Sequence, residues 1–163
     1  MRVLACDGIH PEGLALFRQA GWEVEESEAI KDPKVLAARL ENVDAVLVRS
    51  ATPVPAEALA RATALKVIGR AGAGVDTIDV DAATARGIAV MNAPDGNTLA
   101  AAEHALALLF ALARHVPRAD AGMKQGEWPK AGLTGFELEG KRLGVIGLGR
   151  IGSTVARKAQ GIG

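Results

Sequence analysis

Short apolar runs alternate with helical segments along the first 96 residues, and this alternation constrains the fold more than any other feature of the sequence. The runs cover residues 3–6, 22–24, 45–48, 66–69 and 88–91, and they recur at intervals of roughly 20 residues. The run at 45–48 has no polar alternation, which is typical of a strand buried on both faces of a parallel sheet. Strands that alternate with helices form doubly wound α/β folds with right-handed crossovers. We therefore predict a flavodoxin-like domain with a parallel sheet over residues 1–96.

Helix signals fill the segments between these runs. Helices are predicted at residues 11–20, 33–40, 55–62 and 79–86. Pro33 suits the first turn of the second helix, and Asp79 is placed to cap the fourth. Gly21 and Gly87 follow the first and fourth helices in the position of a left-handed C-cap. The local signals thus agree with the alternation.

The pattern changes after the turn-rich residues 92–97. Thr98 is placed to cap a long Ala- and Leu-rich helix that extends to about Val116, where Pro117 interrupts it. This helix is apolar almost all round, so we expect other elements to cover most of it. A loosely patterned stretch at 121–140 precedes a predicted strand at 141–146 and a helix start at 153–160. Residues 97–163 are therefore expected to be a crossover helix followed by the truncated start of a Rossmann domain.

A glycine motif joins the last predicted strand to the last predicted helix. Gly147, Gly149 and Gly152 have the GxGxxG spacing in the strand–turn–helix context that dinucleotide binding requires. Gly147 permits the tight turn, Gly149 lets the backbone approach a pyrophosphate, and Gly152 lets the helix pack closely. The helix N-terminus then presents N–H groups to the phosphates. The acidic residue that would separate NAD from NADP is expected beyond Gly163, so the motif alone predicts a dinucleotide.

Two arginines follow neighbouring strands of the predicted sheet. Arg49 comes directly after the third apolar run and Arg70 after the fourth. Ligands of open α/β sheets bind at the carboxyl edge, where both side chains would emerge. Arginine forms bidentate hydrogen bonds with phosphate or carboxylate groups. Gly72 and Gly74 follow Arg70 and allow a nest of backbone N–H groups for an anion. The pattern favours an anion site; the alternative is that both arginines are surface residues with local carboxylate partners.

Charge and composition exclude several classes of function. The 163 residues include 19 basic and 19 acidic side chains and carry a net charge of zero, whereas nucleic-acid binders have a basic excess. The longest apolar stretch, 99–116, contains Glu103, His104 and Arg114, so it predicts a buried helix of a soluble protein and no membrane span. The single Cys6 is expected in the core, and it indicates a reducing compartment such as the cytoplasm. No cluster of His and Cys suggests a metal site.

Two other hypotheses fit the residues poorly. A receiver domain also has five strand–helix units, but it needs an aspartate where Arg49 stands and a lysine where Asn92 stands. Glu103 and His104 look like an acid–base pair, yet adjacent helical residues do not face each other. We therefore expect His104 to be a packed, hydrogen-bonded residue of the apolar helix.

Four segments in this order and at this spacing carry a resemblance to a known family. They are residues 49–52 (RSAT), 69–76 (GRAGAGVD), 97–104 and 140–152, the last ending in GLGRIG. Together they resemble the N-terminal half of the D-2-hydroxyacid dehydrogenase family, and within it the members that act on D-3-phosphoglycerate. The resemblance covers essentially the whole chain. It implies NAD as cofactor, oxidation of D-3-phosphoglycerate to 3-phosphohydroxypyruvate as the first step of serine biosynthesis, and a homodimer or tetramer.

The resemblance also implies roles for individual residues. It places the small phosphorylated substrate near Arg49, Ser50, Arg70, Gly72, Ala73, Gly74 and Val75, with Lys130 reaching the site of a neighbouring subunit. It places the cofactor near Ala73, Gly147, Gly149, Arg150, Ile151 and Gly152. The family's catalytic Arg, Glu and His lie downstream of the glycine loop, so we expect no catalytic residue in this chain and no activity from it alone. The alternatives are a glyoxylate or hydroxypyruvate reductase, and a non-catalytic module that binds an anion or dimerises through the helix at 98–116.

Overall fold

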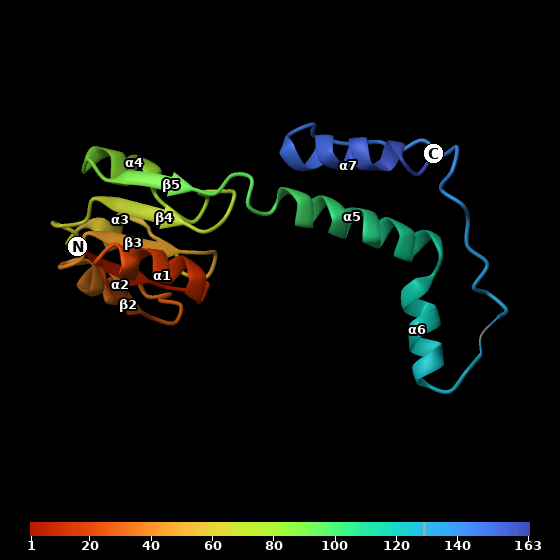
Figure 1. Ribbon diagram of the computed structural model, residues 1–163, viewed down its shortest axis with the longest axis horizontal. Coiled ribbons are helices and arrows are strands. Elements are labelled where there is room, and N and C mark those ends of the chain that lie inside the picture. Colours follow the sequence, from red (N-terminus) through yellow and green to blue (C-terminus); the bar gives the residue numbers. More distant parts are fainter. Residues whose placement is uncertain (129) are drawn as a thin grey trace. The chain divides into compact units, whose positions relative to one another are not determined.

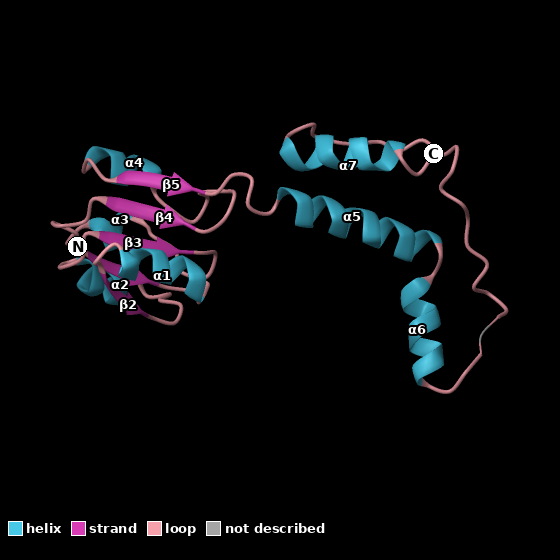
Figure 2. Cartoon of the chain, in the orientation of Figure 1, coloured by secondary structure: helices cyan, strands magenta, loops and turns pink. Residues whose placement is uncertain are grey.

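The computed structural model describes residues 1–128 and 130–163, which form two compact units, Met1–Gly96 and Asn97–Gly163. Figure 1 shows the course of the chain through each unit. The first unit carries a sheet with helices, and the described part of the second is built from helices and loops (Figure 2).

The first unit contains a five-stranded parallel sheet. Its strands are β1 (Arg2–Ala5), β2 (Glu23–Glu26), β3 (Ala45–Val48), β4 (Val67–Arg70) and β5 (Ala89–Asn92). They lie in the order β2-β1-β3-β4-β5, and every neighbouring pair is parallel. This is the strand order of a flavodoxin-like fold, so the predicted fold class is confirmed for this unit.

Helices follow the first four strands, as predicted. They are α1 (Pro11–Gln19), α2 (Pro33–Leu40), α3 (Ala56–Leu59) and α4 (Val80–Ala85). Asp79 caps α4, because its Oδ1 accepts a hydrogen bond from the N–H of Ala82 at 2.9 Å. Gly21 and Gly87 have φ values of +77° and +71°, so both take the left-handed conformation expected of them. The helix α3 is shorter than predicted, because its backbone tightens into a three-residue turn after Leu59.

The core of this unit lies between the sheet and helices α2, α3 and α4. Its fully buried side chains include Leu36, Leu40, Val46, Val48, Leu59 and Ile68. Val46 and Ile68 are register partners of β3 and β4, so they share the face that these helices cover. Leu47 and Val67 lie on the opposite face, near Phe17 of α1. The sheet is therefore apolar on both faces, as the unbroken run at 45–48 predicted.

The edge strand β2 differs from its prediction at 22–24, because it starts at Glu23 and carries charge. Glu25 pairs with Arg39 of α2 at 2.8 Å, and Glu26 pairs with Arg18 of α1 at 2.6 Å. Charged side chains on an edge strand oppose the addition of a further strand. The carboxylates of β2 thus oppose strand pairing at this edge, and they form ion pairs with α1 and α2.

Asp44, just before β3, accepts hydrogen bonds from Arg2 of β1 and from Lys66, just before β4, at the amino edge of the sheet. Its carboxylate accepts hydrogen bonds from the backbone N–H of Arg2 at 2.9 Å and from Nζ of Lys66 at 2.8 Å. The hydrogen bond from Lys66, followed by the one from Arg2, lowers the pKa of Asp44 below its ordinary value of 3.8. A carboxyl group with a lowered pKa stabilises the fold above its ordinary pKa, and that contribution is lost as the pH falls through the folded value.

We therefore expect Asp44→Asn to lower the unfolding free energy at neutral pH and to flatten its fall below about pH 4. Urea denaturation of both proteins across this range measures the effect. Asp120→Asn is the matched control, because Asp120 sits in an exposed pair with Lys124 and such pairs contribute little. An unchanged pH dependence in Asp44→Asn would contradict this account of the amino edge.

The second unit contains α5 (Thr98–Ala113), α6 (Val116–Lys124) and α7 (Arg150–Gln160). Asn97, and not Thr98, is the N-cap of α5. Pro117 does not simply interrupt a helix as predicted; it stands in the first turn of α6, where a residue without an N–H is tolerated. His115 makes the turn between the two helices with a φ of +53°.

Helix α5 packs against α7 but keeps much of its apolar surface exposed within this unit. Lys158 of α7 pairs with Glu103 of α5 at 2.9 Å. Leu99, Leu108 and Leu112 are 58%, 57% and 70% exposed, so the expectation that α5 is covered on most sides is wrong for this unit. In the described part of the chain no single helix is long and apolar enough to cross a membrane, and α5 and α6 meet that test only as a pair bent by 69°.

The strand predicted at residues 141–146 is not formed. These residues pair with no strand among those that the structure describes, and Ile146 is fully exposed. A parallel strand takes its hydrogen bonds from neighbouring strands, so an apolar sequence alone does not make one. This part of the predicted Rossmann start is therefore corrected to an extended segment that leads into α7.

Amide hydrogen exchange should show the contrast between the two regions. We expect slow exchange in β1, β3 and β4, which are hydrogen-bonded on both sides, and fast exchange at residues 141–146, which lack a ladder. Mass spectrometry or NMR of the 163-residue chain measures it directly. Equal protection in the two regions would contradict this description of the second unit.

Candidate functional site

The polar residues Arg49, Arg70 and Asn92 lie at the carboxyl edge of the sheet. Val48, Arg70 and Asn92 are register partners across β3, β4 and β5, and Arg49 follows Val48. The structure therefore brings Arg49 and Arg70 to one edge, as the sequence predicted. Behind them, Val54 and Ile78 form an isolated parallel bridge that joins the loop after β3 to the loop after β4.

The glycine-rich loop after β4 wraps around the side chain of Arg70. Nη1 of Arg70 donates a 2.6 Å hydrogen bond to the carbonyl oxygen of Gly74, and Nη2 of Arg70 lies 3.7 Å from Oδ1 of Asp76. A Cβ on Gly72 would come within 2.9 Å of Nη1, so a larger residue there would crowd the guanidinium. The alternative of a local carboxylate partner is thus partly correct, although the contact to Asp76 is long.

Two observations leave Arg70 with capacity for a ligand. Its side chain is only 10% exposed, and its Nε is buried without a hydrogen-bond partner among the described residues. A buried, unpaired polar atom of a charged group costs free energy until an acceptor reaches it. An anion that approached the guanidinium would supply that acceptor.

Three successive carbonyl oxygens of this loop accept hydrogen bonds from the protein. Gly72 accepts from the N–H of Ala93 at 3.0 Å, Ala73 accepts from Nδ2 of Asn92 at 2.7 Å, and Gly74 accepts from Arg70. In a trans peptide the N–H of the next residue points opposite to the carbonyl. The N–H groups of Ala73, Gly74 and Val75 therefore point away from these partners, although neither Gly72 nor Gly74 takes the left-handed conformation typical of an anion-binding nest.

Arg49 lies beside a pocket at the same edge. Its guanidinium is exposed, while its backbone N–H donates to Oδ2 of Asp7 at 2.8 Å. The pocket has a volume of about 710 Å³ and is lined by Gly8, Ile9, His10, Pro11, Gly13, Arg49 and Ala71. His10 caps α1 there, with its Nδ1 accepting from the N–H of Glu12 at 3.4 Å. Ser50 is exposed next to Arg49.

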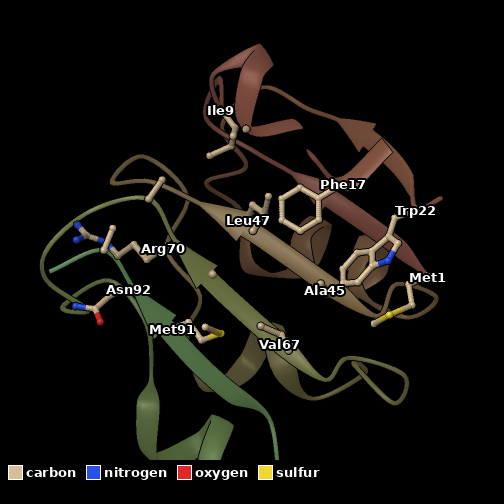
Figure 3. A pocket seen from close by; sticks show the side chains of 14 residues that line it. Met1, Ile9, Phe17, Trp22, Ala45, Leu47, Val67, Arg70, Met91 and Asn92 are labelled. Atoms are coloured by element: carbon tan, nitrogen blue, oxygen red, sulfur yellow. The ribbon is translucent and has the colours of Figure 1, made fainter. Parts of the chain in front are cut away.

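A second pocket, of about 500 Å³, opens on the face of the sheet that α1 partly covers. Figure 3 shows Met1 and Trp22 at one end of it and Arg70 and Asn92 at the other, with Phe17 and Leu47 between them. Its walls are almost entirely apolar, apart from the end formed by Arg70 and Asn92. The polar end of this pocket therefore lies at the carboxyl edge.

Sequence reasoning missed two polar residues of this edge, Asp7 and Asn92. Both follow or end a strand, as Arg49 and Arg70 do, and that position is the signal that could have revealed them. The contact of Asn92 with Ala73 shows that it shapes the loop after β4.

The glycine motif lies in the second unit, at the start of α7. Gly147 has a φ of +92°, which a residue with a side chain rarely adopts. A Cβ on Gly152 would collide with the carbonyl oxygen of Gly147, whereas a Cβ on Gly149 would meet nothing within 4 Å. Gly149 is the N-cap of α7 and provides no side-chain cap for the first turn. These features fit the pyrophosphate of a dinucleotide, whose oxygens would approach Gly149 and the helix N-terminus.

Four other predicted residues lie apart from these clusters. Lys130 is exposed on the loop between α6 and α7, and its role stays a prediction. His104 is exposed, so the expectation of a packed histidine is wrong, and Glu103 pairs with Lys158 instead. Cys6 is buried as expected, and burial together with the charge of Asp7 raises the pKa of its thiol to about 11. Within the described ranges no group of His, Cys, Asp and Glu is placed to hold a metal ion.

The sequence of this chain matches a known family and is similar to that of several enzymes. The model of the D-isomer specific 2-hydroxyacid dehydrogenase catalytic domain matches residues 3–160. D-3-Phosphoglycerate dehydrogenase of Archaeoglobus fulgidus is 46% identical over 99% of this chain and 31% of its own length, and that of Mycobacterium tuberculosis is 48% identical over 99% and 30%. The chain therefore spans about a third of the length of these relatives.

Solved structures show the same relation. The TT0316 protein of Thermus thermophilus has 37% identity and a TM-score of 0.91, over 99% of this chain and 53% of that one. The 3-phosphoglycerate dehydrogenase of Entamoeba histolytica, solved with bound NAD⁺, has 30% identity and a TM-score of 0.78, over 100% of this chain and 51% of that one.

Proposed function

Because the chain belongs to the D-isomer-specific 2-hydroxyacid dehydrogenase family, we propose that it supplies substrate and cofactor binding for the NAD-dependent oxidation of D-3-phosphoglycerate to 3-phosphohydroxypyruvate. The two relatives named D-3-phosphoglycerate dehydrogenase are 46% and 48% identical to this chain. This oxidation is the first step of serine biosynthesis. A cytoplasmic location fits the free, buried thiol of Cys6.

One observation carries the substrate proposal, namely the outward-facing N–H groups of Ala73, Gly74 and Val75 beside Arg70. These N–H groups, next to an arginine with an unpaired Nε, suit the substrate's carboxylate. Arg49 and Ser50 lie at the same edge and would hold the phosphate, whose two negative charges favour an exposed guanidinium. Gly72 keeps room for Arg70, so it acts on the substrate through that side chain.

The second unit is proposed to hold the pyrophosphate of NAD. Gly147 and Gly152 shape the turn, Gly149 lets the phosphates approach, and the backbone of Arg150 and Ile151 lies in the first turn of α7. The cofactor role of Ala73 stays a prediction from the resemblance. NAD, when bound, accepts the hydride that leaves C2 of the hydroxy acid.

We place no proton transfer in these residues. A general base has to lie within hydrogen-bond reach of the substrate hydroxyl. His10 already serves as the cap of α1. The proposed share of this chain is binding and orientation, and the base comes from elsewhere in the complete enzyme.

We also propose that two copies associate through α5. Leu99, Leu108 and Leu112 are more than half exposed, and exposed apolar helix surface of this kind marks an interface. In such a dimer Lys130 would reach the site of the partner subunit. Sedimentation of the chain should show a dimer that Leu108→Lys with Leu112→Lys converts to a monomer; a monomeric wild type would contradict the proposal.

Titration of the purified chain with NADH, followed by nicotinamide fluorescence, tests the proposed function. We expect saturable NADH binding, and no formation of NADH when NAD and D-3-phosphoglycerate are both supplied. Failure to bind NADH would favour a non-catalytic anion-binding module. Turnover by the 163-residue chain would contradict the placement of the base outside it.

A further inference from the structure

Asp7 takes an unusual backbone conformation at the end of β1. Its φ is +66°, and the φ of Gly8 is +64°, so two successive residues are left-handed where the chain leaves the sheet for α1. A residue with a side chain pays a steric cost in this region, and Asp is among the few that tolerate it. The turn places Gly8, Ile9 and His10 along one wall of the 710 Å³ pocket.

The carboxylate of Asp7 is bonded entirely to the loop after β3. Its Oδ2 accepts from the backbone N–H of Arg49 at 2.8 Å and from that of Thr52 at 3.0 Å. Its Oδ1 accepts from the hydroxyl of Thr52 at 2.5 Å. Hydrogen bonds to an ionised acceptor are about twice as strong as neutral ones, so three of them fix this loop firmly.

Thr52 extends the same network to a third loop. Its side chain is completely buried, and its Oγ1 accepts from the backbone N–H of Ile30, which follows β2, at 3.0 Å. The loops that follow β1, β2 and β3 are therefore joined through one carboxylate and one hydroxyl. All three lie at the carboxyl edge, and the loops after β1 and β3 line the pocket.

We propose that Asp7 is a positioning residue for the anion site, which it serves by holding the backbone of Arg49 against the wall formed by residues 8–10. This inference rests on the proposed role of Arg49 in binding phosphate. Both sides of the pocket depend on Asp7, one through its left-handed backbone and the other through its carboxylate. Loss of the carboxylate leaves the guanidinium of Arg49 in the protein but releases the backbone that aims it.

The test is the affinity of the 163-residue chain for inorganic phosphate, followed by NMR at the amide of Arg49. Asp7→Gly keeps the left-handed backbone and removes the acceptors, and it should weaken binding about tenfold. Asp7→Asn keeps one oxygen acceptor and should recover part of that loss. Asp32→Asn is the matched control, because Asp32 also accepts a backbone hydrogen bond, at the cap of α2 and away from the pocket.

A double-mutant cycle with Arg49→Gln separates positioning from a merely structural role. If Asp7 acts through Arg49, Asp7→Gly causes no further loss of phosphate affinity once Arg49 is replaced. Equal losses in the two backgrounds, or unchanged affinity in a folded Asp7→Gly protein, would overturn the inference and leave the proposed function standing. A wild type that binds no phosphate would overturn both.

Discussion

Arg49→Gln should weaken the binding of D-3-phosphoglycerate by about 10- to 100-fold, because a hydrogen-bonded charge pair contributes roughly 1.5–3 kcal/mol. The loss should be much smaller for D-glycerate, which has the same carboxylate and no phosphate. Arg70→Gln should weaken the binding of both ligands, because Arg70 stands beside the N–H groups proposed to hold the carboxylate. Calorimetric titration of each ligand against each variant measures these differences.

Arg18→Gln is the matched control for both arginines. Arg18 pairs with Glu26 on the surface, at the edge strand β2, so its replacement should leave ligand binding unchanged. If Arg49→Gln reduced the affinity for both ligands equally, the phosphate assignment would be wrong. That result would favour an unphosphorylated substrate such as glyoxylate or hydroxypyruvate.

Gly152→Ala should abolish measurable NADH binding and destabilise the start of α7 by about 1–3 kcal/mol. The added methyl group would collide with the carbonyl oxygen of Gly147, so either the helix or the turn has to move. Both the turn and the helix N-terminus are needed for the pyrophosphate. Fluorescence titration with NADH, together with circular dichroism, measures binding and helix content.

Two neighbouring glycines provide the controls. Gly149→Ala has open space and an ordinary φ of −71°, so it should fold normally but weaken NADH binding, because its methyl group would stand where the phosphates approach. Gly144→Ala also has open space and should change neither property. Normal NADH binding by Gly152→Ala would show that the motif is not a cofactor loop.

The first unit follows from local patterns in the sequence. The apolar runs, the capping Asp79 and the left-handed Gly21 and Gly87 each act over a few residues, and they agree with one another. The alternation of strands and helices then leaves few topologies for a parallel sheet. For this reason the sequence also predicts that Arg49 and Arg70 meet at one edge.

Other features depend on contacts between distant residues, which local patterns do not reveal. The donors to Asp7 come from residues 42 and 45 positions away, so its role is visible only in the folded chain. Arg70 fills the loop that holds Gly72 and Gly74, and the orientation of that loop depends on Asn92. Pro117 predicts a break in the helix, but proline also begins helices, as it does in α6.

We propose above all that the carboxyl edge of the first unit binds a phosphorylated 2-hydroxy acid. Titration of the isotopically labelled chain with D-3-phosphoglycerate, observed through its backbone amides, tests this claim most directly. The account predicts saturable shifts at Arg49, Ala73, Gly74 and Val75, which inorganic phosphate reverses in part. Shifts confined to other residues, or no saturation at these four, would contradict it.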